Sequence, residues 1–233
     1  MELRLYPKFE EVFSDDTLEG IFYPLCTAVL PSGKQVHFVS YNGVWTADES
    51  SSNENTSDYY RFKLIDNKYT FSGDISIYQG YEVVGQIHKI LETDFKTNED
   101  HYFKAKLALD KYTDRVKALL PEIDADFDLD TYIEFFYAYS LNKLVYQRTG
   151  QFAKYRQLID GFAKADPSPY VYSQTDKDFD VALYQADFDS LLDLTNYTPI
   201  GMTIGCEFFT DGNDCVLYYN KSDDTVICFN AYS

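Results

Sequence analysis

The alternation of hydrophobic and polar positions predicts β-strands toward both ends of the chain. Runs rich in β-branched and aromatic residues are separated by short turn sequences such as PSG, DN, DG and KSDD, which is typical of hairpins. The predicted strands are CTAVL (26–30), KQVHFVSY (34–41), GVWTA (43–47), YYRFKLI (59–65) and KYTFSG (68–73), and later MTIGCEFF (202–209), DCVLYYN (214–220) and TVICFNAY (225–232).

The segment DISIYQGYEVVGQIHKIL, 74 to 91, lacks a clear period. Gly80 and Gly85 would interrupt a long helix, because glycine lowers helix stability. We therefore predict a strand, or a strand with a short turn, for this segment.

The middle of the chain follows a helical period. Thr97 followed by Asp100 predicts a helix start, and apolar residues then recur at spacings of three and four until Pro121. The segment TYIEFFYAYSLNKLVYQ, 131 to 147, is apolar nearly all round, which predicts a central helix packed on several sides. A third apolar stripe follows in QFAKYRQLIDGFAKA, 151 to 165.

These patterns predict a single α+β domain over residues 1–233 with a mostly antiparallel sheet. Its N- and C-terminal strand regions would join and pack on the central helical segment. The predicted sections are strand-rich 1–93, helical 97–165, an acidic connector at 166–195 and a C-terminal β-meander at 200–232.

Composition adds an acidic charge to this picture. Thirty-eight acids against 20 bases give a net charge of −18, which disfavours binding to nucleic acid or an anionic membrane and favours a basic protein partner. There is no apolar run long enough for a membrane span and no secretion signal, so we expect a cytoplasmic protein with reduced cysteines. The aromatic residues are 22 Tyr, 18 Phe and one Trp, Trp45.

Four aspartates at alternate positions in DADFDLDTYIEF, 124 to 135, suggest a calcium loop. Counting from Asp124, however, the glycine at position 6 and the glutamate at position 12 of such loops are missing. We expect Asp128 or Asp130 to cap the following helix, with Phe127 and Leu129 pointing inward.

Other chemistry lacks a local motif. His37, His88 and His101 have no zinc-binding spacing, and Cys26, Cys206, Cys215 and Cys228 form no CxxC pair, so we predict no metal and no cofactor. His88 and His101 could approach each other across residues 89–100, and the DG turn would place Cys206 and Cys215 on one face of the sheet. Phosphate-binding and serine-nucleophile motifs are absent.

The segment TPIGMTIGCEFFTDGNDCVLYYN, 198 to 220, contains a DG turn between two predicted strands. It resembles the glycine-and-aspartate turn in the C-terminal strands of an immunity superfamily, whose members are implied to neutralise polymorphic bacterial toxins. The match covers about a tenth of the chain. The NGG-type segment near the front of such proteins is absent, and a DG hairpin is common in β-sheets, so no family is assigned.

Two functions remain open. The first is a non-enzymatic protein, in its sharpest form an immunity or inhibitor protein, that occludes a basic toxin or nuclease. Its candidate contacts are the acidic positions Asp124, Asp126, Asp128, Asp130, Asp176, Asp178 and Asp180. The second is a hydrolase or transferase that uses a carboxylate pair or a Cys/His pair in a cleft. A deep pocket that holds His88 or His101 beside carboxylates or a cysteine would favour the second.

Overall fold

The fold is known from a computed structural model. It describes residues 2–41, 43–46, 59–105, 116–120, 127–150, 171–173, 192–203, 208–209 and 214–231.

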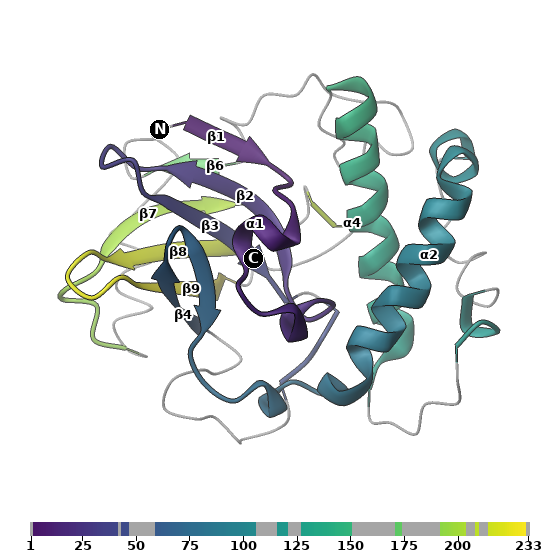
Figure 1. The fold of residues 1–233 in the computed structure, drawn as a ribbon, viewed down its shortest axis with the longest axis horizontal. Helices are drawn as coiled ribbons and strands as arrows, with labels where there is room; N and C mark the ends of the chain where they lie inside the picture. The colour runs from purple at the N-terminus through teal and green to yellow at the C-terminus, as the bar shows by residue number, and fades with distance from the viewer. Residues whose placement is uncertain are drawn as a thin grey trace.

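Two antiparallel sheets make up one side of the molecule (Figure 1). The first sheet has the order β1-β2-β3, and the second has the order β5-β4-β9-β8-β7-β6. The strands are β1 (Glu2–Leu5), β2 (Tyr23–Val29), β3 (Gln35–Ser40), β4 (Tyr59–Ile65), β5 (Lys68–Phe71), β6 (Val171–Ser173), β7 (Thr198–Thr203), β8 (Asp214–Asn220) and β9 (Thr225–Ala231).

The second sheet joins the two ends of the chain, because β4 pairs with β9 over Tyr59–Lys63 and Thr225–Phe229. The prediction that N- and C-terminal strands share a sheet is therefore confirmed for β4 and β5, whereas β1, β2 and β3 form a sheet of their own. Buried residues from both sheets, such as Phe38 and Leu217, belong to the same apolar core. The α+β class is confirmed.

Two long helices lie beside the sheets: α2 (Tyr81–Ala105) and α4 (Leu129–Thr149) (Figure 1). They run in the same direction, because Phe127 packs on Gly80 at their starts and Arg148 forms ion pairs with Glu99 and Asp100 near their ends. Helix α4 buries residues on every side, from Tyr132 to Val145, as its apolar sequence predicted. Short helices α1 (Phe9–Val12), η1 (Asp16–Leu18) and η2 (Ile75–Ile77) complete the described elements.

The strand predicted at 74–91 is wrong, because this segment forms η2 and the first half of α2. Gly80 directly precedes α2 with a φ of 72°, and Gly85 lies inside the helix with Glu19 O 3.7 Å from where its Cβ would be. The predicted helix start at Thr97 is also wrong. Thr97 lies inside α2, where its hydroxyl donates to Thr93 O at 2.8 Å.

The hairpin predicted around residues 66 and 67 is confirmed. Strands β4 and β5 are joined by Asp66 and Asn67, both with positive φ, as a tight type I′ connection requires. The predicted strand at 43–47 is not formed in its described part, where Thr46 makes only an isolated bridge with Tyr78. The DG turn at 211–212 and the helix predicted at 151–165 lie outside the described residues.

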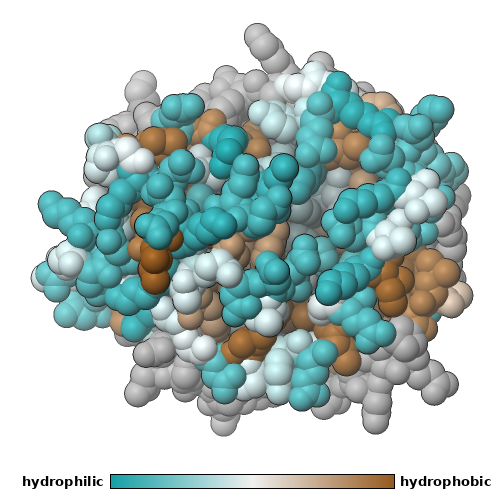
Figure 2. Space-filling model, in the orientation of Figure 1, coloured by the Kyte–Doolittle hydropathy of each residue, from teal (hydrophilic) through white to brown (hydrophobic). Residues whose placement is uncertain are grey.

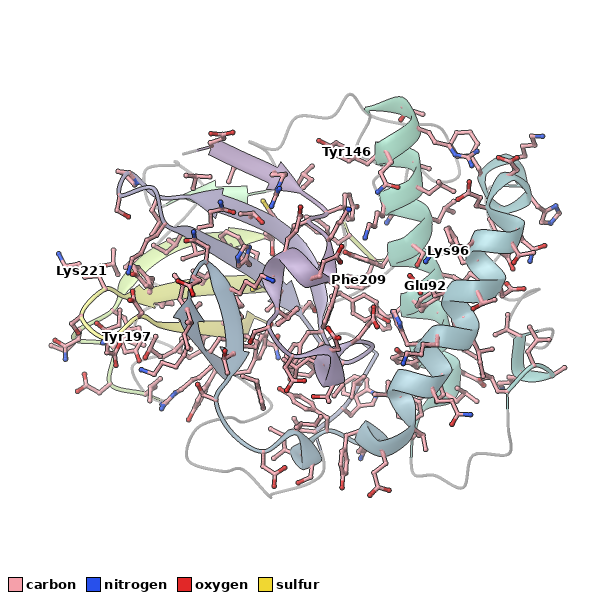
Figure 3. The ribbon with its side chains drawn as sticks, viewed as in Figure 1. Glu92, Lys96, Tyr146, Tyr197, Phe209 and Lys221 are labelled. Atoms are coloured by element: carbon pink, nitrogen blue, oxygen red, sulfur yellow. The ribbon has the colours of Figure 1, made fainter. Side chains whose placement is uncertain are left out.

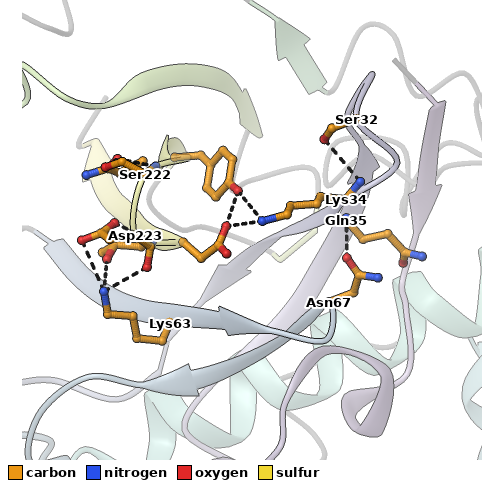
Figure 4. A network of polar contacts seen from close by, with 11 residues as sticks. Ser32, Lys34, Gln35, Lys63, Asn67, Ser222 and Asp223 are labelled. Atoms are coloured by element: carbon orange, nitrogen blue, oxygen red, sulfur yellow. Dashed lines mark hydrogen bonds and ion pairs between the residues drawn. The ribbon is translucent and has the colours of Figure 1, made fainter.

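A polar network fastens the turns of the two sheets together (Figure 4). Lys34, in the β2–β3 turn, binds Asp224 and donates to Tyr219 Oη at 3.2 Å in the other sheet. Gln35 N donates to Asn67 Oδ1 at 3.0 Å across the same boundary. Such solvated contacts contribute little energy each, so the network fixes orientation while the apolar core supplies stability.

Candidate functional site

A cleft of about 420 Å³ opens between α1, the turn that follows η1, and the helices α2 and α4. Figure 2 shows the face that contains it, with hydrophilic surface over α1 and α2 and a hollow between them. Its walls combine aromatic and charged side chains: Lys8, Phe9, Glu10, Glu19, Gly20, Phe22, Tyr23, Pro24, His88, Glu92, Phe95, Lys96, Glu99, Phe136, Tyr139, Ser140, Lys143, Leu144 and Gln147.

Helical spacing explains why α2 forms one wall. His88, Glu92, Lys96 and Glu99 recur at intervals of four, four and three, so they share one face of the helix. Figure 3 labels Glu92 and Lys96 on the side of α2 that faces α4. Helix α4 contributes its own row from Phe136 to Gln147.

His88 is the most unusual group in this wall. Its Nδ1 is buried and has no hydrogen-bond partner among the described residues. The ring packs edge-on against Phe136 at 5.2 Å and lies 6.4 Å from the Tyr23 ring. Burial lowers the pKa of His88 to about 4, so the imidazole is neutral near pH 7. A neutral ring with an unsatisfied nitrogen is suited to bind or exchange a proton with a ligand.

Gly20 allows the chain to approach His88 closely. It adopts a φ of 92°, and a Cβ at this position would lie 2.9 Å from His88 Cβ and 3.1 Å from Tyr132 Oη. Tyr132 donates to Gly20 O at 2.8 Å, which pins the turn to α4. The glycine therefore places Glu19, its neighbour in sequence, at the edge of the cleft.

Lys143 enters the cleft from α4 without a carboxylate partner among the described residues. Its ammonium group lies 5.7 Å from the centre of the Tyr139 ring. Burial lowers the pKa of Lys143, although Glu92 opposes the shift. A partly buried lysine that forms no ion pair with a described residue is notable in a chain with 38 acids and 20 bases, and it can hold an anionic group.

Glu19 is the counterpart of Lys143. It is partly buried, and its carboxylate makes no ion pair or side-chain hydrogen bond with the described residues. Burial raises its pKa and the nearby Glu92 adds to the increase, whereas Lys89 and Lys96 oppose it. Glu19 can therefore carry a proton closer to neutral pH than an ordinary glutamate.

The other described histidines are unlike His88. His37 accepts from the Thr27 hydroxyl at Nδ1 (2.9 Å) and donates from Nε2 to Asn67 O (2.8 Å), as the structural role predicted for it requires. His101 is exposed. The predicted approach of His88 and His101 is wrong, because thirteen positions on α2 separate them by about 20 Å along the helix axis.

The described cysteines offer no nucleophile. Cys26, Cys215 and Cys228 are buried free thiols, and burial raises the pKa of Cys26 to about 12 and that of Cys228 as well. A thiolate is thus disfavoured at both positions. Cys206, and with it the predicted approach to Cys215, lies outside the described residues.

Of the acidic positions predicted as contacts, the structure describes Asp128 and Asp130. Asp128 caps α4 by accepting from Thr131 N at 3.1 Å, and Asp130 lies in the first turn and pairs with Lys117, so the predicted helix start is confirmed. Phe127 is buried, as predicted. The remaining candidates, Asp124, Asp126, Asp176, Asp178 and Asp180, lie outside the described residues.

Comparisons with family models, with curated proteins and with solved structures find no match to this chain. Within the described ranges, no cluster of three histidine, cysteine or acidic residues could hold a metal ion. In the same ranges no helix is long and apolar enough to cross a membrane. The cleft is therefore the feature of the described structure that best indicates a function.

Sequence reasoning missed Glu19 and Lys143. Each lies in an ordinary local context, and neither belongs to a motif. They become notable only because the fold partly removes water from them while neither forms an ion pair with a described residue. The one available signal was that 131–147 is apolar nearly all round, which makes a lysine inside it unusual.

Proposed function

We propose that the protein binds a small organic molecule in this cleft, with His88, Lys143 and Glu19 as its polar contacts. One observation carries the proposal: three titratable side chains from three separate elements line an aromatic-walled cleft. Among the described residues, Nδ1 of His88 has no hydrogen-bond partner, and neither Glu19 nor Lys143 forms an ion pair. Binding sites typically combine apolar walls with a few such groups. A proton transfer between the ligand and His88 or Glu19 is the chemistry these groups supply, which favours the second function inferred from the sequence.

The test is a ligand screen that monitors named groups by NMR. The histidine ring signals and the ¹³C-methylated lysine signals are followed while pools of amino acids, mono- and dicarboxylates, and sugar phosphates are added. We expect at least one pool to shift the His88 and Lys143 signals and to leave His37, which is buried in the first sheet, unchanged. Lys143→Met should abolish the response. Lys221→Met should keep it, because Lys221 lies in the turn between β8 and β9 and does not line the cleft (Figure 3).

The proposal fails if no pool perturbs His88 or Lys143. It also fails if a response persists unchanged in Lys143→Met, since the ligand would then bind elsewhere.

A second candidate is the basic protein partner inferred from the net charge, with a cytoplasmic inhibitor or immunity protein as its sharpest form. One observation favours it. Trp45 is 49% exposed and Tyr81 is 38% exposed, and the two lie near each other because Gln79 N donates to Trp45 O at 2.7 Å. The acids Asp74 and Glu82 lie close to Tyr81, and both act on its hydroxyl group. Exposed aromatics supply binding energy, while acids steer a basic partner and repel nucleic acid.

This candidate is tested by affinity capture from the native host followed by binding measurements on any captured basic protein. Trp45→Ala should weaken binding by about 30-fold, the loss typical of an interface hot spot. Glu82→Lys should slow association at low salt. Ile65→Ala is the control, because Ile65 is similarly exposed on β4, away from Trp45 in sequence. Equal affinity of the Trp45 and Ile65 variants would exclude this surface.

A further inference from the structure

Most of the charged side chains that line the cleft form ion pairs, and two do not. Three lysines and four glutamates contribute to its walls. Lys8 pairs with Glu10 at 3.8 Å, Lys96 with Glu92 at 2.9 Å, and Glu99 with Arg148 at 2.8 Å. These pairs involve exposed or half-exposed side chains and already satisfy one another, so they leave little charge for a ligand to neutralise.

Two opposite charges remain, Lys143 and Glu19. Neither forms an ion pair with a described residue, and they do not pair with each other. Both are partly buried, and a charge that loses water without gaining a direct ion pair costs free energy. Lys89 and Lys96 near Glu19, and Glu92 near Lys143, offset only part of that cost. They come from different elements, Glu19 from the turn before β2 and Lys143 from α4. Within the described ranges, the site therefore presents one positive and one negative group that each lack a direct ion-pair partner.

Neutral and apolar surface surrounds these two charges. His88 is neutral near pH 7, and the Phe22, Phe136 and Tyr139 rings line the same cleft. The volume of about 420 Å³ is within the usual range for small-molecule sites. A ligand that complements this arrangement has an anionic group, a cationic group and an apolar or aromatic body.

We propose that the cleft binds a small zwitterion, namely a free α-amino acid with an apolar or aromatic side chain. Lys143 holds its carboxylate, Glu19 holds its ammonium group, and the aromatic walls contact its side chain. The inference rests on the proposed function and specifies the ligand class of the same site. Each charged group of the protein then regains by binding the partner that folding does not supply.

The test is calorimetric titration of the full chain with L-phenylalanine, L-leucine and two analogues of L-phenylalanine. N-acetyl-L-phenylalanine lacks the cation, and L-phenylalaninamide lacks the anion. We expect at least one amino acid to bind, and L-phenylalanine to bind at least tenfold more tightly than either analogue. In Lys143→Met, L-phenylalanine and its amide should bind equally weakly. In Glu19→Gln, L-phenylalanine and its N-acetyl form should bind equally weakly. Lys221→Met, which changes a lysine of the β8–β9 turn that does not line the cleft, should match the parent protein.

Each other result overturns a defined part. If N-acetyl-L-phenylalanine binds as tightly as L-phenylalanine, the zwitterion inference fails and an anion site remains. If no amino acid binds but another pool in the NMR screen shifts His88, the ligand class is wrong and the proposed function stands. If neither experiment detects binding while circular dichroism shows every variant folded, both proposals fail.

Discussion

The surroundings of His37 in the first sheet and of His88 in the cleft form a natural comparison. Burial lowers the pKa of both imidazoles to about 4. In the sheet, both ring nitrogens of His37 are hydrogen-bonded, to Thr27 and to Asn67. In the cleft, Nδ1 of His88 has no partner among the described residues.

The comparison shows that a shifted pKa alone does not identify a functional site. Burial lowers the pKa of both histidines. At His37, strand β2 and the β4–β5 turn supply a hydrogen-bond partner for each ring nitrogen. The property that distinguishes the two sites is whether each buried ring nitrogen has a hydrogen-bond partner. A buried polar atom without a partner costs free energy that a ligand can recover. The buried carboxylate Asp94 belongs with His37 in this respect, since it accepts from Tyr102, Tyr137 and Asn98.

The largest expected effect comes from replacing each histidine with leucine. His37→Leu leaves the Thr27 hydroxyl and the Asn67 carbonyl without partners, so we expect a loss of about 3 kcal/mol in the free energy of unfolding. His88→Leu removes a polar atom that has no partner, so its effect should stay within about 1 kcal/mol. Urea unfolding monitored by circular dichroism measures both. Equal losses would erase the proposed difference between the two sites.

Acid should destabilise the protein through the sheet histidine. The pKa of His37 is about 4 in the folded state and about 6.5 when unfolded, so the unfolded chain binds the proton first as the pH falls. The stability that this histidine contributes is therefore present above pH 6.5 and is lost between pH 6.5 and 4. We expect a loss of about 2 kcal/mol from His37 between pH 7 and 4.5.

Urea unfolding at the two pH values tests this expectation, with His37→Leu as the reference that lacks the group. The variant should lose less stability on acidification than the parent by that amount. An identical pH dependence would show that His37 is not protonated at lower pH in the folded state than in the unfolded state.

Gly20 in the cleft wall and Gly33 in the β2–β3 turn of the first sheet differ in how closely they are packed. Gly20 and Gly33 both have positive φ, but a Cβ on Gly20 would meet His88, Tyr132 and Val84 within 3.2 Å, whereas none lies within 4 Å at Gly33. Both alanine variants incur backbone strain, and only Gly20→Ala adds overpacking, so it should lose about 1.5 kcal/mol more. Thermal unfolding provides the measurement. Similar melting temperatures of the two variants would mean that the side chains around Gly20 rearrange at little cost in free energy.

The smallest effect concerns two lysines, one in the cleft and one in the network between the sheets. Burial lowers the pKa of Lys143, whereas the hydrogen bond to Asp224 raises that of Lys34. ¹³C signals of reductively methylated lysines, followed from pH 7 to 12, should show Lys143 losing its proton first. The reverse order would show that the ammonium group of Lys143 is not shielded from water, in contradiction to its partial burial. Lys143→Arg assigns the signal.

Local pattern predicted much of the fold. The hairpin at Asp66 and Asn67, the buried helix at 131–147 and the cap at Asp128 follow from interactions within a few residues, so they could be inferred without the fold. The first half of α2 could not. Gly80 and Gly85 predict an interrupted helix, but Gly80 lies just before α2. Inside the helix, the contacts of α2 with α4 outweigh the cost of Gly85.

The sequence by itself determined the α+β class, the acidic charge and the absence of the common catalytic motifs, because these depend on composition and short-range spacing. Only the tertiary structure decided which polar groups stay unsatisfied. Glu19, His88 and Lys143 are 69 and 55 positions apart along the chain, and their pairing depends on which elements pack together. Burial and partnership are properties of that packing, and so the cleft emerged only from the fold.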